Sequence, residues 1–373
     1  FATQNKEGTL KEAFDEWMGK AEGKAVIDYG FHMAVVEANN RTLKEIEELP
    51  EWGITSIKVY MAYKNILQLE DDEIYKVMEV CGRKGILVGV HAEIGDLVDF
   101  NVKNLLSEGK TEPKYHAISR PAELEADAID RAILLANSAG AVPYIVHVSS
   151  ALGMTRIIEA KAKGLKVLSE TCPQYLLLDD EKLSLPDFEG AKYVCSPPLR
   201  KKEDNDYLWQ ALSEGEFEIV STDHCPFNFE GQKTIGRNAF NKIPNGLPGI
   251  EDRIPVLYSE GVKKGRLNLR QFVNLTSTNP AKVFGMFPTK GVIAPGADAD
   301  IYILNPEKER TISSTTHHMN VDYNPYEGLK VNGKIEYVFL RGNLIVSEGK
   351  FLAEKGSGKY VKQNTGILDR SIL

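Results

Sequence analysis

The sequence predicts an α/β fold, and within that class a (β/α)8 (TIM) barrel followed by a small β-rich domain. Short apolar runs alternate with stretches whose apolar residues recur at helical spacing, which is typical of parallel strands joined by crossover helices. The runs lack polar–apolar alternation, as expected for a sheet that is covered on both faces. From about Asn279 onward, short runs separated by turn residues indicate the second domain.

The expected barrel strands come to seven before residue 225, counting a stub at Phe1-Ala2 that reads as the tail of a strand. A closed barrel of this type needs eight strands, so we expect the first strand and most of the second to lie upstream of this sequence. The other strands are expected at Lys24–Met33, Ile54–Met61, Ile86–Ala92, Pro143–Val148, Leu165–Thr171 and Glu218–Thr222. Helices are expected at Leu10–Met18, Asp71–Lys84, Pro121–Ser138, Met154–Lys163 and Tyr207–Glu214.

We place the barrel at residues 1–285, the β-rich domain at residues 286–350 and a C-terminal arm, extended or partly disordered, at residues 351–373. In the β-rich domain, Val338–Arg341 and Leu344–Val346 flank the turn Arg341-Gly342-Asn343, which predicts a hairpin.

The composition excludes several classes of protein. The net charge is −8 and there is no long basic run, which argues against a nucleic-acid-binding protein. No apolar run approaches the roughly 18 residues of a membrane span. The four cysteines occur without CxxC spacing, which is typical of a reducing compartment. We therefore expect a cytoplasmic protein that binds neither nucleic acid nor membranes.

Four of the expected strands carry a metal-binding side chain at or near their C-terminal end. These residues are Lys58, His91, His147 and Asp223. The C-terminal ends of the strands form one rim of a barrel, and barrel enzymes carry out their chemistry at that rim. We therefore expect the four side chains to converge on one site.

His91 and His147 each end a buried apolar run. Either residue alone would more often be a hydrogen-bonded core histidine, but two at equivalent barrel positions favour metal ligation. Neutral imidazole suits Zn²⁺ and related ions. Glu93 and Ser149 are close enough in sequence to hydrogen-bond these ligands, although a solvated loop position is an equal alternative for both.

Lys58 lies in the middle of an apolar run, where an unpaired charge would be costly to bury. Burial favours the neutral amine, which can react with CO₂ to give a carbamate, a two-oxygen anion that is able to bridge two cations. An ion pair with a carboxylate and a Schiff-base lysine are the alternatives. The two histidines favour the carbamate.

Asp223 follows the last expected strand and is a candidate to ligate a metal, accept a proton from water and return it to a leaving nitrogen. A helix cap is the alternative for this aspartate. The neighbouring His224 suits either a contact with substrate or with a metal-binding side chain, or an ordinary loop position.

In combination these motifs resemble the cyclic amidohydrolases, and within them the hydantoinase/dihydropyrimidinase group, over essentially the whole chain. The resemblance is carried by Lys58 with Met61-Ala-Tyr63, Val90-His-Ala-Glu93, Val146-His-Val-Ser149, Ser169-Glu-Thr-Cys-Pro-Gln-Tyr175, Cys195-Ser-Pro-Pro-Leu-Arg200, Ser221-Thr-Asp-His-Cys-Pro226 and Pro244-Asn-Gly246.

The resemblance implies a binuclear metal site, with zinc as the expected metal, bridged by N-carboxylated Lys58. His91 and His147 would hold one ion and Asp223 the other, with Asp223 also acting as the catalytic proton carrier. Tyr63 would donate to the developing oxyanion and contact the substrate.

The resemblance also assigns the substrate pocket. Ser196 and Asn245 would hold the cyclic amide through their backbone groups, and Tyr60 and Leu67 would line the pocket for the side group of the substrate. The implied activity is hydrolysis of the cyclic amide bond of hydantoins or dihydropyrimidines by a homodimer or homotetramer. An allantoinase- or dihydroorotase-like enzyme and a non-catalytic homologue or inactive fragment are the alternatives.

One motif of the family is absent. The family carries a His-x-His motif at the end of its first barrel strand, and none of the seven histidines of this sequence forms one. We therefore expect the sequence to be truncated at its N-terminus and its second metal site to be incomplete.

Overall fold

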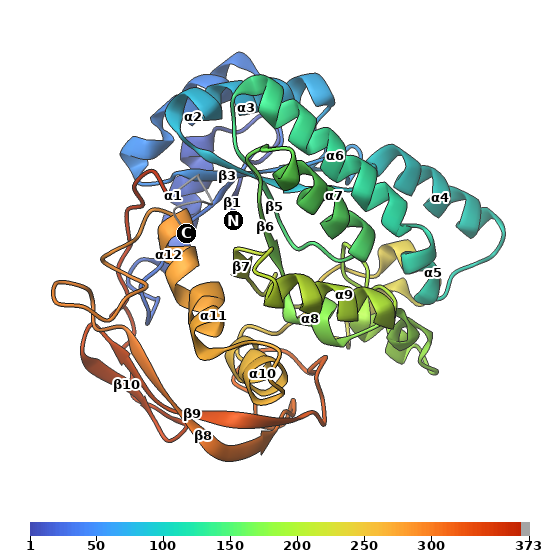
Figure 1. Ribbon diagram of the computed structural model, residues 1–373. Coiled ribbons are helices and arrows are strands. Elements are labelled where there is room, and N and C mark those ends of the chain that lie inside the picture. Colours follow the sequence, from blue (N-terminus) through green and yellow to red (C-terminus); the bar gives the residue numbers. More distant parts are fainter. Residues whose placement is uncertain (367–373) are drawn as a thin grey trace.

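The computed structural model describes residues 1–366 and contains two sheets, one parallel and covered by helices, the other antiparallel (Figure 1). The parallel sheet has seven strands in sequence order, and β1 and β7 are its edges. The strands are β1 (Ala2–Thr3), β2 (Met33–Ala34), β3 (Ser56–Tyr60), β4 (Leu87–His91), β5 (Pro143–Ile145), β6 (Leu168–Thr171) and β7 (Ile219–Val220). This order, with helices between parallel strands, confirms the predicted barrel fold.

Helices lie outside the sheet, and apolar residues of strands and helices form one large core between them. The α-helices are α1 (Leu10–Ala21), α2 (Asn40–Trp52), α3 (Asp71–Lys84), α4 (Gly95–Ser107), α5 (Lys114–Ile118), α6 (Ala122–Ala139), α7 (Ala151–Ala162), α8 (Pro173–Leu177), α9 (Lys202–Ser213), α10 (Arg253–Leu257), α11 (Leu269–Val273) and α12 (Asn279–Val283). Among residues 1–366, every helix is too short or too polar to span a lipid bilayer.

The expected strand at Lys24–Met33 is wrong for most of its length, because the structure pairs only Met33 and Ala34 with the sheet. Tyr29 instead forms a bridge with Tyr360 of the C-terminal segment. The ring of Tyr360 also stacks on Phe31, with ring centroids 5.6 Å apart. These apolar residues are therefore buried by a segment about 330 residues away rather than by a neighbouring strand.

The second sheet contains β8 (Ile301–Thr311), β9 (Lys330–Leu340), β10 (Asn343–Ser347) and β11 (Lys350–Phe351), in the order β11-β10-β9-β8. The predicted hairpin is formed by β9 and β10. Arg341 and Gly342 connect the two strands with φ of 46° and 81°, which is the left-handed geometry of a tight hairpin turn.

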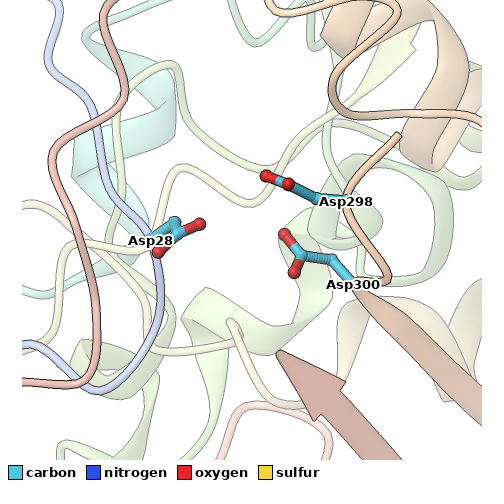
Figure 2. Close-up of side chains that lie close together, drawn as sticks. All are labelled: Asp28, Asp298 and Asp300. Atoms are coloured by element: carbon cyan, nitrogen blue, oxygen red, sulfur yellow. The ribbon is translucent and has the colours of Figure 1, made fainter. Parts of the chain in front are cut away.

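A cluster of charged residues joins the barrel to the β-rich part. Asp28, Asp298 and Asp300 turn their carboxylates toward one space, with oxygens within 4.8 Å of one another (Figure 2). Lys290 Nζ lies 2.6 Å from Asp28 and 2.8 Å from Asp298, and it also pairs with Asp300. Burial opposes the charge, but these three carboxylates raise the pKa of Lys290 above its ordinary value. The lysine therefore takes the place that a cation would occupy.

Replacing Lys290 with methionine is expected to lower the free energy of unfolding by about 3 kcal/mol, because three carboxylates then lose a shared, largely buried partner. Chemical denaturation measures the loss. Lys76→Met on α3 is the matched control, since its pair with Asp72 is exposed, and we expect a change within about 0.5 kcal/mol. Equal effects of the two substitutions would contradict a structural role for the cluster.

Candidate active site

A cavity of about 870 Å³ lies at the C-terminal ends of the barrel strands. Its lining includes every residue to which the sequence assigns a role in catalysis, metal binding or substrate binding, namely Lys58, Tyr60, Tyr63, Leu67, His91, His147, Ser196, Asp223 and Asn245. The structure thus brings together residues that are up to 187 positions apart in the chain.

The local backbone explains how the strands present these side chains. Lys58 lies within β3 and His91 ends β4, whereas His147 and Asp223 come just after β5 and β7. The φ angles of His147 and Asp223 are 43° and 46°, and Tyr63 has a φ of 70°. Left-handed conformations are unfavourable for residues other than glycine and concentrate at functional sites.

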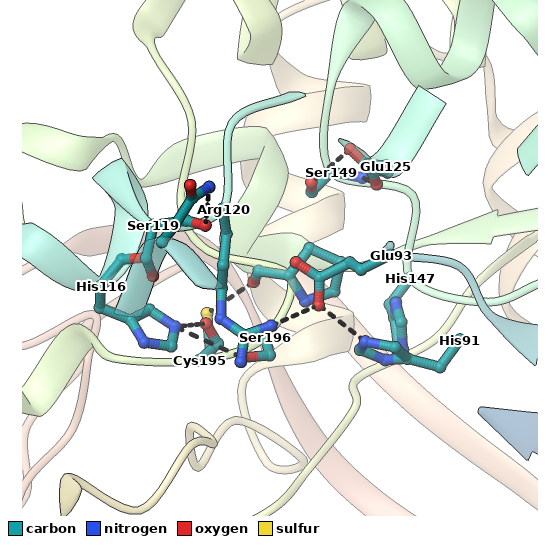
Figure 3. Close-up of polar contacts among 12 residues, drawn as sticks. His91, Glu93, His116, Ser119, Arg120, Glu125, His147, Ser149, Cys195 and Ser196 are labelled. Atoms are coloured by element: carbon teal, nitrogen blue, oxygen red, sulfur yellow. Dashed lines mark hydrogen bonds and ion pairs between the residues drawn. The ribbon is translucent and has the colours of Figure 1, made fainter. Parts of the chain in front are cut away.

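The imidazoles of His91 and His147 face one another, with 3.1 Å between His91 Nδ1 and His147 Nε2 (Figure 3). His91 Nε2 lies 2.7 Å from the Glu93 carboxylate. Because a carboxylate accepts hydrogen bonds, the ring proton of His91 belongs on Nε2, which leaves the Nδ1 lone pair directed toward His147. Metal-binding histidines are held by carboxylates in this way.

Glu93 is kept ionised by its surroundings. Burial would raise its pKa, but the Arg120 guanidinium and the hydrogen bond from His91 outweigh burial and lower the pKa to about 2. Arg120 Nη1 lies 2.8 Å from the same carboxylate oxygen that contacts His91. A fixed negative charge therefore orients the His91 ring.

His147 is neutral, because burial, followed by the positive charge of Lys58 and the nearby His91 ring, holds its pKa well below the ordinary value. Its Nδ1 atom is buried and finds no hydrogen-bond partner within residues 1–366. Imidazole nitrogens and carboxylate oxygens are ligand types that suit Zn²⁺ and related ions, and His91, His147 and Asp223 line the same cavity. The residues present therefore fit a divalent metal.

Lys58 is 5% exposed, and its amine lies 4.5 Å from the Phe1 ring centroid and 5.0 Å from that of Tyr60. Within the described part of the chain, no carboxylate forms an ion pair with this amine. The ion pair that was one alternative for Lys58 is therefore not formed among these residues.

Tyr63 lines the cavity beside His91 and Arg120. Its ring lies 5.1 Å from that of His91, and the Arg120 guanidinium lies 5.7 Å from the same tyrosine ring. Burial raises the pKa of Tyr63 above its ordinary value, more than Arg120 and a hydrogen bond with Ser196 lower it. The phenol therefore keeps its proton near neutral pH.

His116 is a buried residue beside Ser196 to which the sequence gave no role. Its Nε2 lies 2.8 Å from the Cys195 carbonyl oxygen and 3.3 Å from Ser196 Oγ (Figure 3). Burial, followed by the charge of Arg120, lowers the pKa of His116 to about 3. The neutral ring thus donates one hydrogen bond to the segment that carries Ser196.

This pKa predicts a pH dependence of stability. His116 is protonated near pH 6.5 in the unfolded chain but only near pH 3 in the folded chain. The stability that the neutral His116 contributes to the folded chain is therefore lost as the pH falls through 6.5 and below. We expect His116→Gln, which keeps a donor, to remove about 2 kcal/mol of the stability difference between pH 7 and pH 5. Urea denaturation at both pH values measures it, and an unchanged pH dependence would contradict the assignment.

Arg200 and Glu125 also form part of the support around the cavity, although the sequence indicated no partners for them. Arg200 donates to Ser149 Oγ at 2.9 Å and to the Arg120 carbonyl at 2.5 Å. Ser149 Oγ in turn donates to Glu125 at 2.8 Å. Ser149 therefore donates to Glu125 rather than to a histidine, whereas Glu93 accepts the expected hydrogen bond from His91.

His224 lines the cavity and also orders a loop. Its Nδ1 accepts a hydrogen bond from the Gly249 backbone N–H at 3.1 Å. His224 thus holds a loop at the edge of the cavity, and its contact with substrate stays a prediction.

Comparison with known proteins places the chain in a family. Residues 2–345 match the model of the amidohydrolase family. The chain is 51% identical over 364 residues to a D-hydantoinase from Geobacillus stearothermophilus, covering 97% of this chain and 77% of the relative. A D-hydantoinase from Streptomyces coelicolor is 47% identical over 365 residues, covering 98% and 78%.

Solved structures agree with this assignment. A dihydropyrimidinase from Brevibacillus agri superposes with a TM-score of 0.97 at 53% identity, covering 98% of this chain and 80% of that chain. An L-hydantoinase (dihydropyrimidinase) from Arthrobacter aurescens superposes with a TM-score of 0.87 at 29% identity, covering 95% and 78%. As its motifs predicted, the chain belongs to the amidohydrolase family.

Proposed function

We propose that this protein hydrolyses the cyclic amide bond of hydantoins and dihydropyrimidines. One observation carries the proposal: a single cavity is lined by Lys58, His91, His147 and Asp223 together with Tyr63. The chain around that cavity is about half identical to D-hydantoinases over nearly its whole length.

In this proposal the cavity holds divalent metal, with zinc as the expected ion. His91 and His147 would ligate one ion and Asp223 a second, and Lys58, carboxylated on Nζ, would bridge them. The second ion would have an incomplete ligand set in this sequence, because no His-x-His motif is present. When bound, the ions supply Lewis-acid activation of the carbonyl and of the attacking water. The buried, neutral His147 and the orientation of His91 by Glu93 support this ligand assignment.

The protein groups then carry the proton and stabilise the charge. Asp223 accepts a proton from the attacking water and returns it to the ring nitrogen as the C–N bond breaks. Tyr63 donates to the oxygen of the tetrahedral intermediate, where its protonated phenol acts as part of an oxyanion hole. Backbone groups of Ser196 and Asn245 hold the cyclic amide, and Tyr60 and Leu67 surround the side group of the substrate.

The test is ring opening of hydantoin and of dihydrouracil by the zinc-loaded protein, with chromatographic detection of the N-carbamoyl product. Allantoin and dihydroorotate are the comparison substrates. The proposal expects faster turnover of hydantoin and dihydrouracil than of allantoin and dihydroorotate. Opening of the second pair alone would contradict it.

We further propose a cytoplasmic homodimer or homotetramer. The free thiols of Cys81, Cys172, Cys195 and Cys225 support a reducing compartment. Light scattering measures the mass, and a monomer at micromolar concentration would contradict the assembly.

A further inference from the structure

Lys233 is a fully buried lysine beside the candidate active site. It begins the 3-10 helix η3 (Lys233–Gly236) and is 0% exposed, and it does not line the cavity. Within the described residues, its ammonium donates to backbone carbonyls and to no carboxylate. A buried cation without a counter-ion is costly unless strong hydrogen bonds compensate it. Burial accordingly lowers the pKa of Lys233 to about 7, although the Cys195 and Cys225 thiols oppose the shift.

The two carbonyls belong to the segments assigned to hold the substrate. Lys233 Nζ lies 2.9 Å from the Val194 oxygen and 3.1 Å from the Pro244 oxygen. Val194 stands two positions before Ser196, and Pro244 directly precedes Asn245. The Val194 oxygen also accepts a hydrogen bond from the Gly246 backbone N–H at 3.0 Å. One side-chain amine thus connects the two segments without lining the cavity.

The surroundings of Lys233 are apolar and tightly packed. Val194, Phe240 and Ile243 belong to one buried apolar cluster. A Cβ atom added at Gly236 would come within 2.7 Å of the Ile243 backbone nitrogen, so η3 packs directly on the chain that leads to Pro244. Charge–dipole interactions are strong where water is excluded. The hydrogen bonds from Lys233 therefore hold both carbonyls firmly in place.

We propose that Lys233 is a positioning residue, which holds the backbone of the Ser196 and Asn245 segments in the arrangement that binds the cyclic amide. The inference rests on the proposed function. Among residues 1–366, the Lys233 ammonium forms no hydrogen bond or ion pair with the ligand set or with Tyr63, so its removal acts on substrate binding and leaves the chemical step nearly intact.

The experiment compares Lys233→Met, which keeps the chain length and removes the charge, with wild type. We expect KM for hydantoin to rise about tenfold with kcat within about threefold, because a charged hydrogen-bonding group is lost from the binding segments only. Zinc content, measured by atomic emission, is expected to stay unchanged. Ile157→Ala, a buried change on α7, is the matched control and is expected to lower Tm with KM unchanged.

The outcomes separate this inference from the proposed function. An inactive wild-type protein would contradict the proposed function, whereas an active wild type with equal KM in Lys233→Met would contradict only the role of Lys233. A parallel loss of kcat and bound zinc would also overturn that role. If Lys233→Met does not fold, Lys233→Gln, which keeps one donor, carries the same expectation with a smaller rise in KM.

Discussion

Lys58→Ala is expected to lose bound metal and ring-opening activity together. Without the carboxylated side chain the two ions have no bridging ligand, and His91 and His147 remain as the only nitrogen ligands of one of them. We expect activity to fall at least about a thousandfold, the scale of a lost metal-dependent step. Metal analysis and the hydantoin assay on the same sample measure both losses.

Chemical rescue distinguishes the bridging role from simple loss of a buried side chain. Acetate or propionate can supply the missing carboxylate in the space left by Lys58, so partial recovery of metal and of rate is expected. Lys64→Ala is the control, since Lys64 is an exposed residue paired with Asp96, and its variant is expected to behave as wild type. Retention of full metal content in Lys58→Ala would contradict a ligand role for Lys58.

Asp223→Asn is expected to reduce kcat by about a thousandfold or more, because general acid–base catalysis contributes roughly 10²–10⁴ and the amide cannot carry the proton. The side chain keeps its shape, and the φ of 46° at this position is tolerated by asparagine as well as by aspartate. Steady-state kinetics with fixed zinc content measure the effect.

A matched aspartate tests whether the effect belongs to the site. Asp206 lies on α9 in an exposed pair with Lys202, and Asp206→Asn is expected to leave kcat unchanged. A variant Asp223→Asn with more than a tenth of the wild-type kcat would show that another group transfers the proton.

The barrel could be predicted from the sequence because the residues that begin and end most of its elements lie within those elements or next to them. Helix α3 has the predicted bounds Asp71–Lys84, with acidic residues in its first turn and Gly85 in left-handed geometry at its end. Helix α4 was not predicted, since it begins at Gly95 and no side chain caps it. Where an element depends on packing with a distant segment, as around Tyr29, the local pattern is misleading.

The candidate site likewise contains residues that a local sequence pattern predicts and residues that depend on partners far away in the chain. Lys58, His91, His147 and Asp223 could be chosen from the sequence because strand ends meet at one rim of a barrel. Arg120 could not be chosen from the sequence, because its partner Glu93 is 27 positions away and no sequence periodicity relates the two residues. Lys233 was missed for the same reason, because its acceptors are backbone carbonyls 39 and 11 positions away.

A crystal structure of the zinc-loaded protein, with anomalous data at the zinc edge, tests the central claim most directly. We predict an anomalous peak bonded to His91 and His147, and planar density for a carboxylate on the Nζ atom of Lys58. An unmodified Lys58 amine beside well-ordered zinc, or zinc bound elsewhere with these four side chains free of metal, would contradict the claim.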